Sequence, residues 1–198
     1  MISAPSGTGK STLIARLMKT VDDLAFSVSW TTRAPRAGEH DGEAYHFTDE
    51  ATFRRLVSEG AFIEWAEVHG HLYGSARDQI ESLEATGKDV ILDVDVQGAR
   101  QVRASGASLT SIFILPPSRE LLLARLEGRG SESRASLRRR MADALVELRE
   151  YPAFDYLVIN DDLEHAAEEL IAIVRASRVE RGRRAERAEA ILRSFAEQ

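Results

Sequence analysis

The sequence predicts an α/β fold in which helices cover both faces of a parallel sheet. Three short runs rich in β-branched and aliphatic residues, at 90–96, 111–115 and 156–159, have the composition of strands buried on both faces. Helical patterns separate these runs along the chain. Because strands that alternate with helices usually form parallel sheets with helices on both faces, we expect this architecture here.

The sequence marks the boundaries of the core helices. Ser118 is a typical N-cap residue for a helix over 118–126. A second helix is expected over 133–150, because Pro152 follows it and cannot continue a helix. A third helical pattern runs from Leu163 to the C-terminus.

Residues 32–86 differ in character from the rest of the chain. They combine a polar loop over 33–42 with half-apolar strands such as 61–65. We therefore expect a small α+β lobe inserted after the second core strand. The chain is then a single domain over 1–198, with a core at about 1–31 and 87–198.

The composition narrows the class of protein. Apolar residues make up 43% of the 198 residues and charged residues 29%, as in ordinary folded domains. The net charge of −6 disfavours a nucleic-acid-binding protein, which usually needs a basic surface. Arginines near the C-terminus alternate with glutamates, which favours a solvated helix face with ion pairs over a nucleic-acid patch.

The cysteine count and the hydropathy of the chain narrow its possible chemistry and location. The chain has no cysteine, which excludes disulfides, thiolate catalysis and cysteine-ligated zinc. No run approaches the roughly 18 apolar residues of a membrane span, and the start has no signal-peptide pattern. We therefore expect a cytoplasmic enzyme without membrane contacts.

The strongest functional signal is the glycine-rich segment Ser6–Thr12, which opens a helix at Leu13. Glycines let backbone N–H groups turn toward phosphate oxygens, and a helix N-terminus adds partial positive charge. Lys10 can then reach the β- and γ-phosphates of a nucleotide, and the Ser11 hydroxyl can bind Mg²⁺. The pattern departs from the usual one at Ala4, where glycine is typical and a positive φ would strain alanine.

Only residues 1–3 precede this loop. Either the first strand is very short, or the chain lacks its natural start.

A second polar segment holds Arg33 and Arg36 on either side of Pro35. The arginine fork suits bidentate binding of phosphate oxygens, and proline stiffens the loop that presents it.

Several further segments follow in a fixed order: 45–47, 62–65, 73–75 and 92–98. Taken with the two loops, they resemble guanylate kinase from Ser3 to about Asp162. The resemblance implies a parallel-sheet P-loop kinase core, a GMP-binding lobe at about 32–86, and a helical lid at about 125–140.

The resemblance also implies the acceptor site. The positions that bind the GMP phosphate are matched by Arg33, Arg36, Tyr45 and Tyr73. Those that hold the guanine base are matched by Ser29, Glu64 and Ser75. Asp93 and Asp95 match a pair at the end of the central strand, near the base and the water shell of the metal. From the residues alone, the tyrosines could instead pack in the interior, and the two aspartates could cap a helix or contact a loop.

The donor site is implied in the same way. ATP is expected to lie on the phosphate loop, at Ala4, Pro5, Ser6, Gly7, Thr8, Gly9, Lys10, Ser11 and Thr12. Arg125 belongs to the lid, and Asn160 matches the edge of the site for the donor base. Mg²⁺ is expected on Ser11, with Asp93 or Asp95 acting through water. The catalytic set is Lys10, Arg33, Arg129 and Arg140, whereas Arg138 and Arg139 are expected to be solvated.

The implied reaction moves the γ-phosphoryl group of ATP to GMP, and to dGMP, through positioning and charge stabilisation without a dedicated general base. An inactive guanylate-kinase-like module that binds other proteins is the chief alternative. The intact Gly9–Ser11 segment and the lack of a further domain disfavour it. A P-loop kinase for another phosphorylated acceptor is disfavoured by the base-binding set. The sequence leaves the oligomeric state open.

Overall fold

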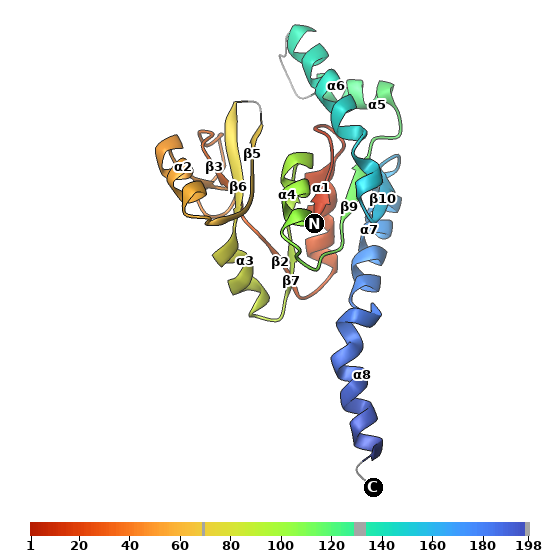
Figure 1. The fold of residues 1–198 in the computed structure, drawn as a ribbon. Helices are drawn as coiled ribbons and strands as arrows, with labels where there is room; N and C mark the ends of the chain where they lie inside the picture. Colours follow the sequence, from red (N-terminus) through yellow and green to blue (C-terminus); the bar gives the residue numbers. More distant parts are fainter. Residues whose placement is uncertain (69, 129–133, 197–198) are drawn as a thin grey trace.

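The computed structural model describes residues 1–68, 70–128 and 134–196 (Figure 1). Its core is a parallel sheet in the order β10-β9-β1-β8, and a parallel pair β2-β7 continues it. The strands are β1 (Ile2–Ser3), β2 (Leu24–Phe26), β7 (Asp89–Ile91), β8 (Asp93–Val94), β9 (Ile112–Leu115) and β10 (Tyr156–Ile159). Because only Leu92 separates β7 from β8, these two strands form one extended stretch that joins both sheets.

Helices cover both faces of this sheet, as the sequence predicts. On one face, α1 (Lys10–Thr20) packs against α7 (Leu163–Ser177), and their buried side chains join those of the sheet in one core cluster. On the other face lie α3 (Arg77–Glu84) and α4 (Val96–Ala104). β9 shows the alternation directly, because Ile112 and Ile114 join the first cluster and Phe113 joins the second.

A second, mixed sheet has the order β4-β3-β6-β5. Its strands are β3 (Trp30–Thr31), β4 (His46–Phe47), β5 (Phe62–Val68) and β6 (His71–Ala76). Helix α2 (Glu50–Ser58) covers this sheet through Phe53, whose ring stacks on Phe62 with 4.7 Å between centroids. Figure 1 shows this sheet and α2 standing to one side of the parallel core. It has its own core cluster, formed by residues between Trp30 and Ala76, whereas α3, also within the range expected for the lobe, packs on the parallel core through Ile80.

Two further helices, α5 (Arg119–Glu127) and α6 (Arg134–Leu148), lie above the core in Figure 1. Ser118 caps α5 as expected, because its side chain accepts a hydrogen bond from the Leu121 N–H at 3.2 Å. The pair shares a small apolar cluster centred on Leu122 and Leu126. In the ranges given above, no helix has both the length and the apolar composition to cross a membrane.

Three expectations about individual elements are wrong. The strand expected over 90–96 ends at Val94, because Asp95 caps α4 and Val96 begins it, and the extended part before that divides between two partners, β2 and β1. β10 is not buried on both faces: only Val158 is buried, since β10 is the last strand of its sheet and has one neighbour. The helix from Leu163 is not continuous, because α7 ends at Ser177 and α8 (Arg181–Ala196) begins at Arg181.

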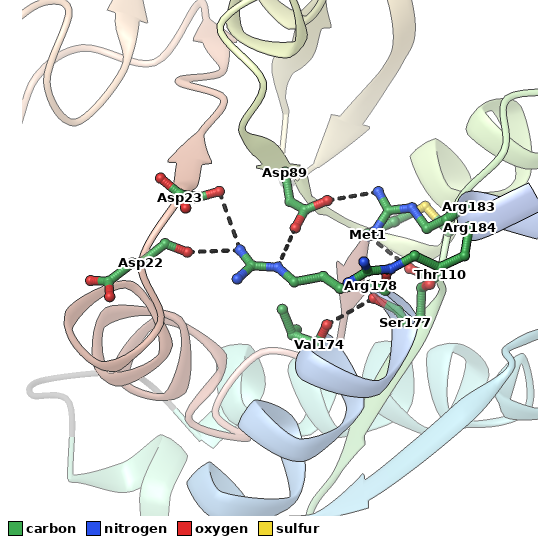
Figure 2. Close-up of polar contacts among 10 residues, drawn as sticks. All are labelled: Met1, Asp22, Asp23, Asp89, Thr110, Val174, Ser177, Arg178, Arg183 and Arg184. Atoms are coloured by element: carbon green, nitrogen blue, oxygen red, sulfur yellow. Dashed lines mark hydrogen bonds and ion pairs between the residues drawn. The ribbon is translucent and has the colours of Figure 1, made fainter. Parts of the chain in front are cut away.

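The junction of α7 and α8 is tied to the base of the sheet (Figure 2). Arg178 donates to Asp89 at 2.6 Å and to the Asp22 carbonyl at 2.7 Å, and Arg183 donates to the other Asp89 oxygen at 2.6 Å. The Arg178 carbonyl accepts from the Arg184 guanidinium at 3.0 Å. These contacts lie at the break between the helices, and they give part of the arginine-rich segment the ion-pairing role that the sequence predicts.

Loss of this junction should destabilise the fold. Partial burial raises the pKa of Asp89, but the hydrogen bonds from Arg178 and Arg183 outweigh it and bring the pKa below its usual value. We expect Arg178→Ala to lower the free energy of unfolding by about 1–2 kcal/mol at pH 7. Because the folded pKa is depressed, this stabilisation is present above the usual pKa of aspartate and is lost as the pH falls.

Chemical denaturation of wild type and Arg178→Ala at pH 7 and pH 3 measures the effect. Arg175→Ala, an exposed arginine on the same helix, is the control. A difference between wild type and Arg178→Ala that is the same at both pH values would contradict this account.

Candidate active site

A cleft of about 1170 Å³ lies at the carboxyl ends of β1 and β8, between the phosphate loop, the mixed sheet and α6. This edge of a parallel sheet is where α/β proteins bind ligands. Most of the predicted site residues line this cleft: Ala4, Pro5, Ser6, Gly7, Thr8, Gly9, Lys10, Ser11, Ser29, Arg33, Arg36, Tyr45, Glu64, Tyr73, Asp93, Asp95 and Arg140. Segments far apart in the sequence therefore meet at one site.

The phosphate loop has the backbone that the glycines permit. Gly7 and Gly9 have φ of 92° and 94°, a region that favours glycine. A Cβ atom at Gly9 would also lie 2.4 Å from Asn160 Nδ2. Among the described residues, Asp23 is the only non-glycine residue with positive φ, so Ala4 carries none of the strain considered for it.

The loop is held from behind by two predicted donor-site residues that do not line the cleft. Asn160 donates from Nδ2 to the Thr8 carbonyl at 2.6 Å, and Arg125 donates to the same carbonyl at 3.3 Å. Arg125 also donates to the Asn160 carbonyl at 3.0 Å. Arg140 reaches the loop from α6 and donates to Ser6 Oγ at 2.5 Å. These contacts fix the shape of the loop; contacts with a donor base stay a prediction.

Lys10 is paired with a carboxylate inside the cleft. Lys10 forms an ion pair with Asp93 and donates to the Val94 carbonyl at 3.1 Å. Asp95 caps α4 by accepting from the Gly98 N–H at 2.8 Å, which is the alternative role that the sequence allows for such a carboxylate. Its second oxygen accepts from Gln97 at 3.2 Å.

At the opposite end of the cleft, Arg33 and Glu39 form two parallel hydrogen bonds of 2.9 Å each. These bonds raise the pKa of Arg33 above its usual value, so the guanidinium is always charged. The Arg36 N–H donates to the same carboxylate at 2.8 Å. Tyr45 lies 5.2 Å below the Arg33 guanidinium and 5.8 Å from the Tyr73 ring, so both tyrosines pack beside this cation and still face the cleft.

Glu64 is a buried carboxylate, with 5% of its surface exposed. The Ser75 hydroxyl donates to its Oε1 at 2.6 Å. Burial raises the pKa of Glu64 from 4.5 to about 7, and the negative charge of Asp95 adds to the effect. Ser29, the third residue predicted to hold a base, is also buried at the cleft.

Four residues of α6 that the sequence analysis did not assign to the site also line the cleft: Ser136, Arg139, Asp143 and Glu147. Arg139 is exposed, as expected, and it also lines the cleft. Burial raises the pKa of Glu147 to about 7, and the negative charge of Asp95 adds to it. A signal for three of the four exists in the sequence, because positions 136, 140, 143 and 147 share one face of a helix. Of the predicted residues, Arg129 lies outside the described part of the chain. Thr12 and Ser75 are not among those lining the cleft, and Ser75 is buried behind Glu64, to which it donates.

A glycine-rich loop between a parallel strand and a helix, with its lysine in a cleft rich in cations, defines a P-loop nucleotide-binding protein. The comparisons with known proteins are more specific. A guanylate kinase family model matches residues 1–177. Guanylate kinases of Aromatoleum aromaticum and Nitrosococcus oceani are 49% and 48% identical, and the alignments span 90% and 97% of this chain and 88% and 95% of the relatives.

The solved structures agree with these relatives. A crystal structure of guanylate kinase from Anaplasma phagocytophilum matches with a TM-score of 0.72 and 34% identity, over 90% of this chain and 85% of that one. The chain therefore belongs to the guanylate kinase family, and it is a nucleoside monophosphate kinase. The inactive binding module, the alternative left by the sequence, is not favoured.

The buried carboxylate makes a testable contribution to stability. Because the pKa of Glu64 is raised from 4.5 to about 7, the folded protein holds a proton there that the unfolded chain releases. The free energy of unfolding should therefore fall as the pH rises from about 4.5 to about 7. Glu64→Gln cannot ionise at this position and should not show this loss. The free energy of unfolding of the variant, relative to that of wild type, should therefore rise by up to about 3 kcal/mol between pH 5 and pH 8.

Urea denaturation at pH 5 and pH 8 measures this change. Glu81→Gln, an exposed glutamate on α3, is the matched control. If Glu64→Gln and wild type change in parallel with pH, then Glu64 is not the buried acid that the structure describes.

Proposed function

We propose that the protein transfers the γ-phosphoryl group of ATP to GMP, and also to dGMP, which gives ADP and the corresponding guanine nucleoside diphosphate. The observation that carries this proposal is the presence, in one cleft, of a phosphate loop and a buried hydrogen-bond acceptor, Glu64. Guanine offers two neighbouring donors, N1–H and the 2-amino group, whereas adenine has an unprotonated N1 and no 2-amino group. An ionised carboxylate only accepts hydrogen bonds, so Glu64 suits guanine and disfavours adenine.

The donor nucleotide would lie on the phosphate loop. Backbone N–H groups of the loop and the N-terminus of α1 would receive its phosphates. We expect Lys10 to exchange Asp93 for oxygens of the β- and γ-phosphates, because a doubly charged phosphate competes well for an ammonium group.

The metal assigned to this site is Mg²⁺. The hydroxyl of Ser11 and the carboxylates of Asp93 and Asp95 are hard oxygen ligands, and all three residues line the cleft. Magnesium in such sites is held by one or two protein oxygens together with the phosphates, so this set of residues fits it. When bound, the ion would neutralise charge on the β- and γ-phosphates.

The acceptor phosphate would bind Arg33, Arg36, Tyr45 and Tyr73. Glu39 already orients the Arg33 guanidinium, and aromatic rings flank it, so little side-chain freedom is lost when a phosphate binds. The base would lie between Glu64, Ser75 and Ser29, and the oxygens of the two nucleotides would then face each other across the cleft.

Transfer itself needs positioning and charge stabilisation rather than covalent help. Lys10 and Arg140 lie on the phosphate-loop side and Arg33 on the acceptor side, so cations surround the space between. A lid over about 125–140 would exclude water, which otherwise hydrolyses ATP. Arg129 is assigned to that lid from the sequence alone. We assign the reaction to purine nucleotide metabolism in the cytoplasm, the compartment that the sequence favours.

Lys10→Ala should remove catalysis without unfolding the protein. We expect kcat to fall on the order of 10²–10³-fold, because the lysine stabilises charge on the transferred group. Coupled ADP-release assays at saturating ATP and GMP measure the rate, and circular dichroism checks the fold. Lys19→Ala, an exposed lysine on the last turn of the same helix, should keep wild-type activity. Turnover within a few-fold of wild type in Lys10→Ala would place the reacting phosphates elsewhere.

Base selection provides the second test. Removing a buried partner of a hydrogen-bonded substrate weakens selection strongly, since the matching groups are left unpaired. Glu64→Ala should raise the transition-state free energy for GMP by about 2–4 kcal/mol, which lowers kcat/KM for GMP. The kcat/KM for AMP should change little. The GMP-over-AMP ratio should therefore shrink on the order of 10²-fold.

The measurement is kcat/KM for a panel of nucleoside monophosphates at saturating ATP with Mg²⁺. Glu81→Ala on the exposed face of α3 is the control. Wild-type activity confined to GMP and dGMP is the result that this proposal requires, and an unchanged ratio in Glu64→Ala would show that guanine is read elsewhere.

A further inference from the structure

The first turns of α4 lie directly against the Glu64 carboxylate. Gly98 is the residue at the contact, and a Cβ atom built there would lie 2.2 Å from Glu64 Oε2 and 3.0 Å from its Cδ. Heavy atoms do not approach so closely, so any side chain at position 98 must displace the carboxylate. The same Cβ would lie at an ordinary 3.4 Å from Asp95 Oδ1. The conflict is therefore with Glu64 alone.

The carboxylate cannot simply move aside with its strand. β5 is the edge strand of the mixed sheet, and its backbone is tied to α4 by Gln101. That side chain accepts from the Trp65 N–H at 3.1 Å and donates to the Trp65 carbonyl at 2.5 Å. With the residue next to Glu64 held in this way, only the Glu64 side chain is free to change its position, and doing so breaks its bond to Ser75.

We propose that Gly98 is a positioning residue that determines base specificity: the bare backbone of α4 leaves the space in which the Glu64 carboxylate meets the acceptor base. The inference rests on the proposed function, because it concerns how the same site selects guanine. A larger residue at 98 shifts the carboxylate away from Ser75 while the phosphate loop, Lys10 and Arg33 keep their places. The ability to bind ATP is then retained and the choice of base is lost.

The test is Gly98→Ala, with Gly182→Ala as its matched control. Both glycines lie within helices, so alanine favours the helix equally at each, but nothing lies within 4 Å of a Cβ atom at 182. In Gly98→Ala we expect the GMP-over-AMP ratio of kcat/KM to fall on the order of 10²-fold. The KM for ATP and the melting temperature should remain close to wild type, and Gly182→Ala should match wild type in every assay.

A double-mutant cycle separates displacement of the carboxylate from general damage to the site. Glu64→Asp is one methylene shorter and makes room for a Cβ atom at 98. In that background Gly98→Ala should change the ratio by no more than about three-fold, a strong departure from additivity. If Gly98→Ala alone fails to fold, the double variant must fold, because the shorter side chain removes the conflict.

Three results would overturn this inference and leave the proposed function standing. The first is a GMP-selective wild type whose ratio survives Gly98→Ala, and the second is an equal loss from Gly98→Ala in wild type and in Glu64→Asp. The third is failure of both Gly98→Ala and the double variant to fold. A wild type with no preference for GMP over AMP would instead overturn the proposed function.

Discussion

The site depends on a carboxylate removed from water where the two sheets meet. Isolated ionised groups are costly to bury, and Glu64 shows the cost as a pKa raised to about 7. Three elements hold it there: β5 carries it, β6 supplies the Ser75 hydroxyl, and α4 supplies a surface without a side chain. In the proposed complex, guanine would bring two N–H donors to this carboxylate. The base would then complete hydrogen bonds that the fold leaves unmade, which is how a site discriminates strongly against an analogue without those donors.

The cations of the cleft follow a related principle. Both cations and carboxylates line the cleft, and two of the cations are already paired, Lys10 with Asp93 and Arg33 with Glu39. Pairing limits the repulsion between the cations and fixes their geometry. In the proposed reaction, a phosphate would replace or join an existing partner rather than order a free side chain. The geometry of the phosphate loop is also fixed in advance, because Asn160 and Arg125 donate hydrogen bonds to the Thr8 carbonyl from outside the cleft.

The features that the sequence reveals are those whose chemistry is local. The phosphate loop is contiguous, and its glycines indicate the backbone that they permit, so the loop is recognisable from the order of its residues alone. Strands and helices of the core follow from periodicity, and helices do cover both faces of the sheet. Family resemblance supplies the acceptor residues, and nearly all of them line one cleft.

The features that the sequence does not reveal depend on distant partners. The run at 90–96 divides between two partner strands from different places in the chain, and the last helix breaks where Arg178 binds Asp89, which is far away in the sequence. The contact between Gly98 and Glu64 crosses from core to mixed sheet, and no local pattern indicates it.

Proton linkage tests the central role of Glu64 most directly. Calorimetric titration of GMP into wild type and Glu64→Gln at pH 7, in buffers of different ionisation enthalpy, counts the protons released on binding. Titration of the GMP phosphate contributes equally to both proteins, so the difference reports Glu64. With a pKa of about 7, wild type should release about half a proton more than the variant. Equal proton release by the two proteins would contradict the account, because guanine would then bind without ionising the buried carboxylate.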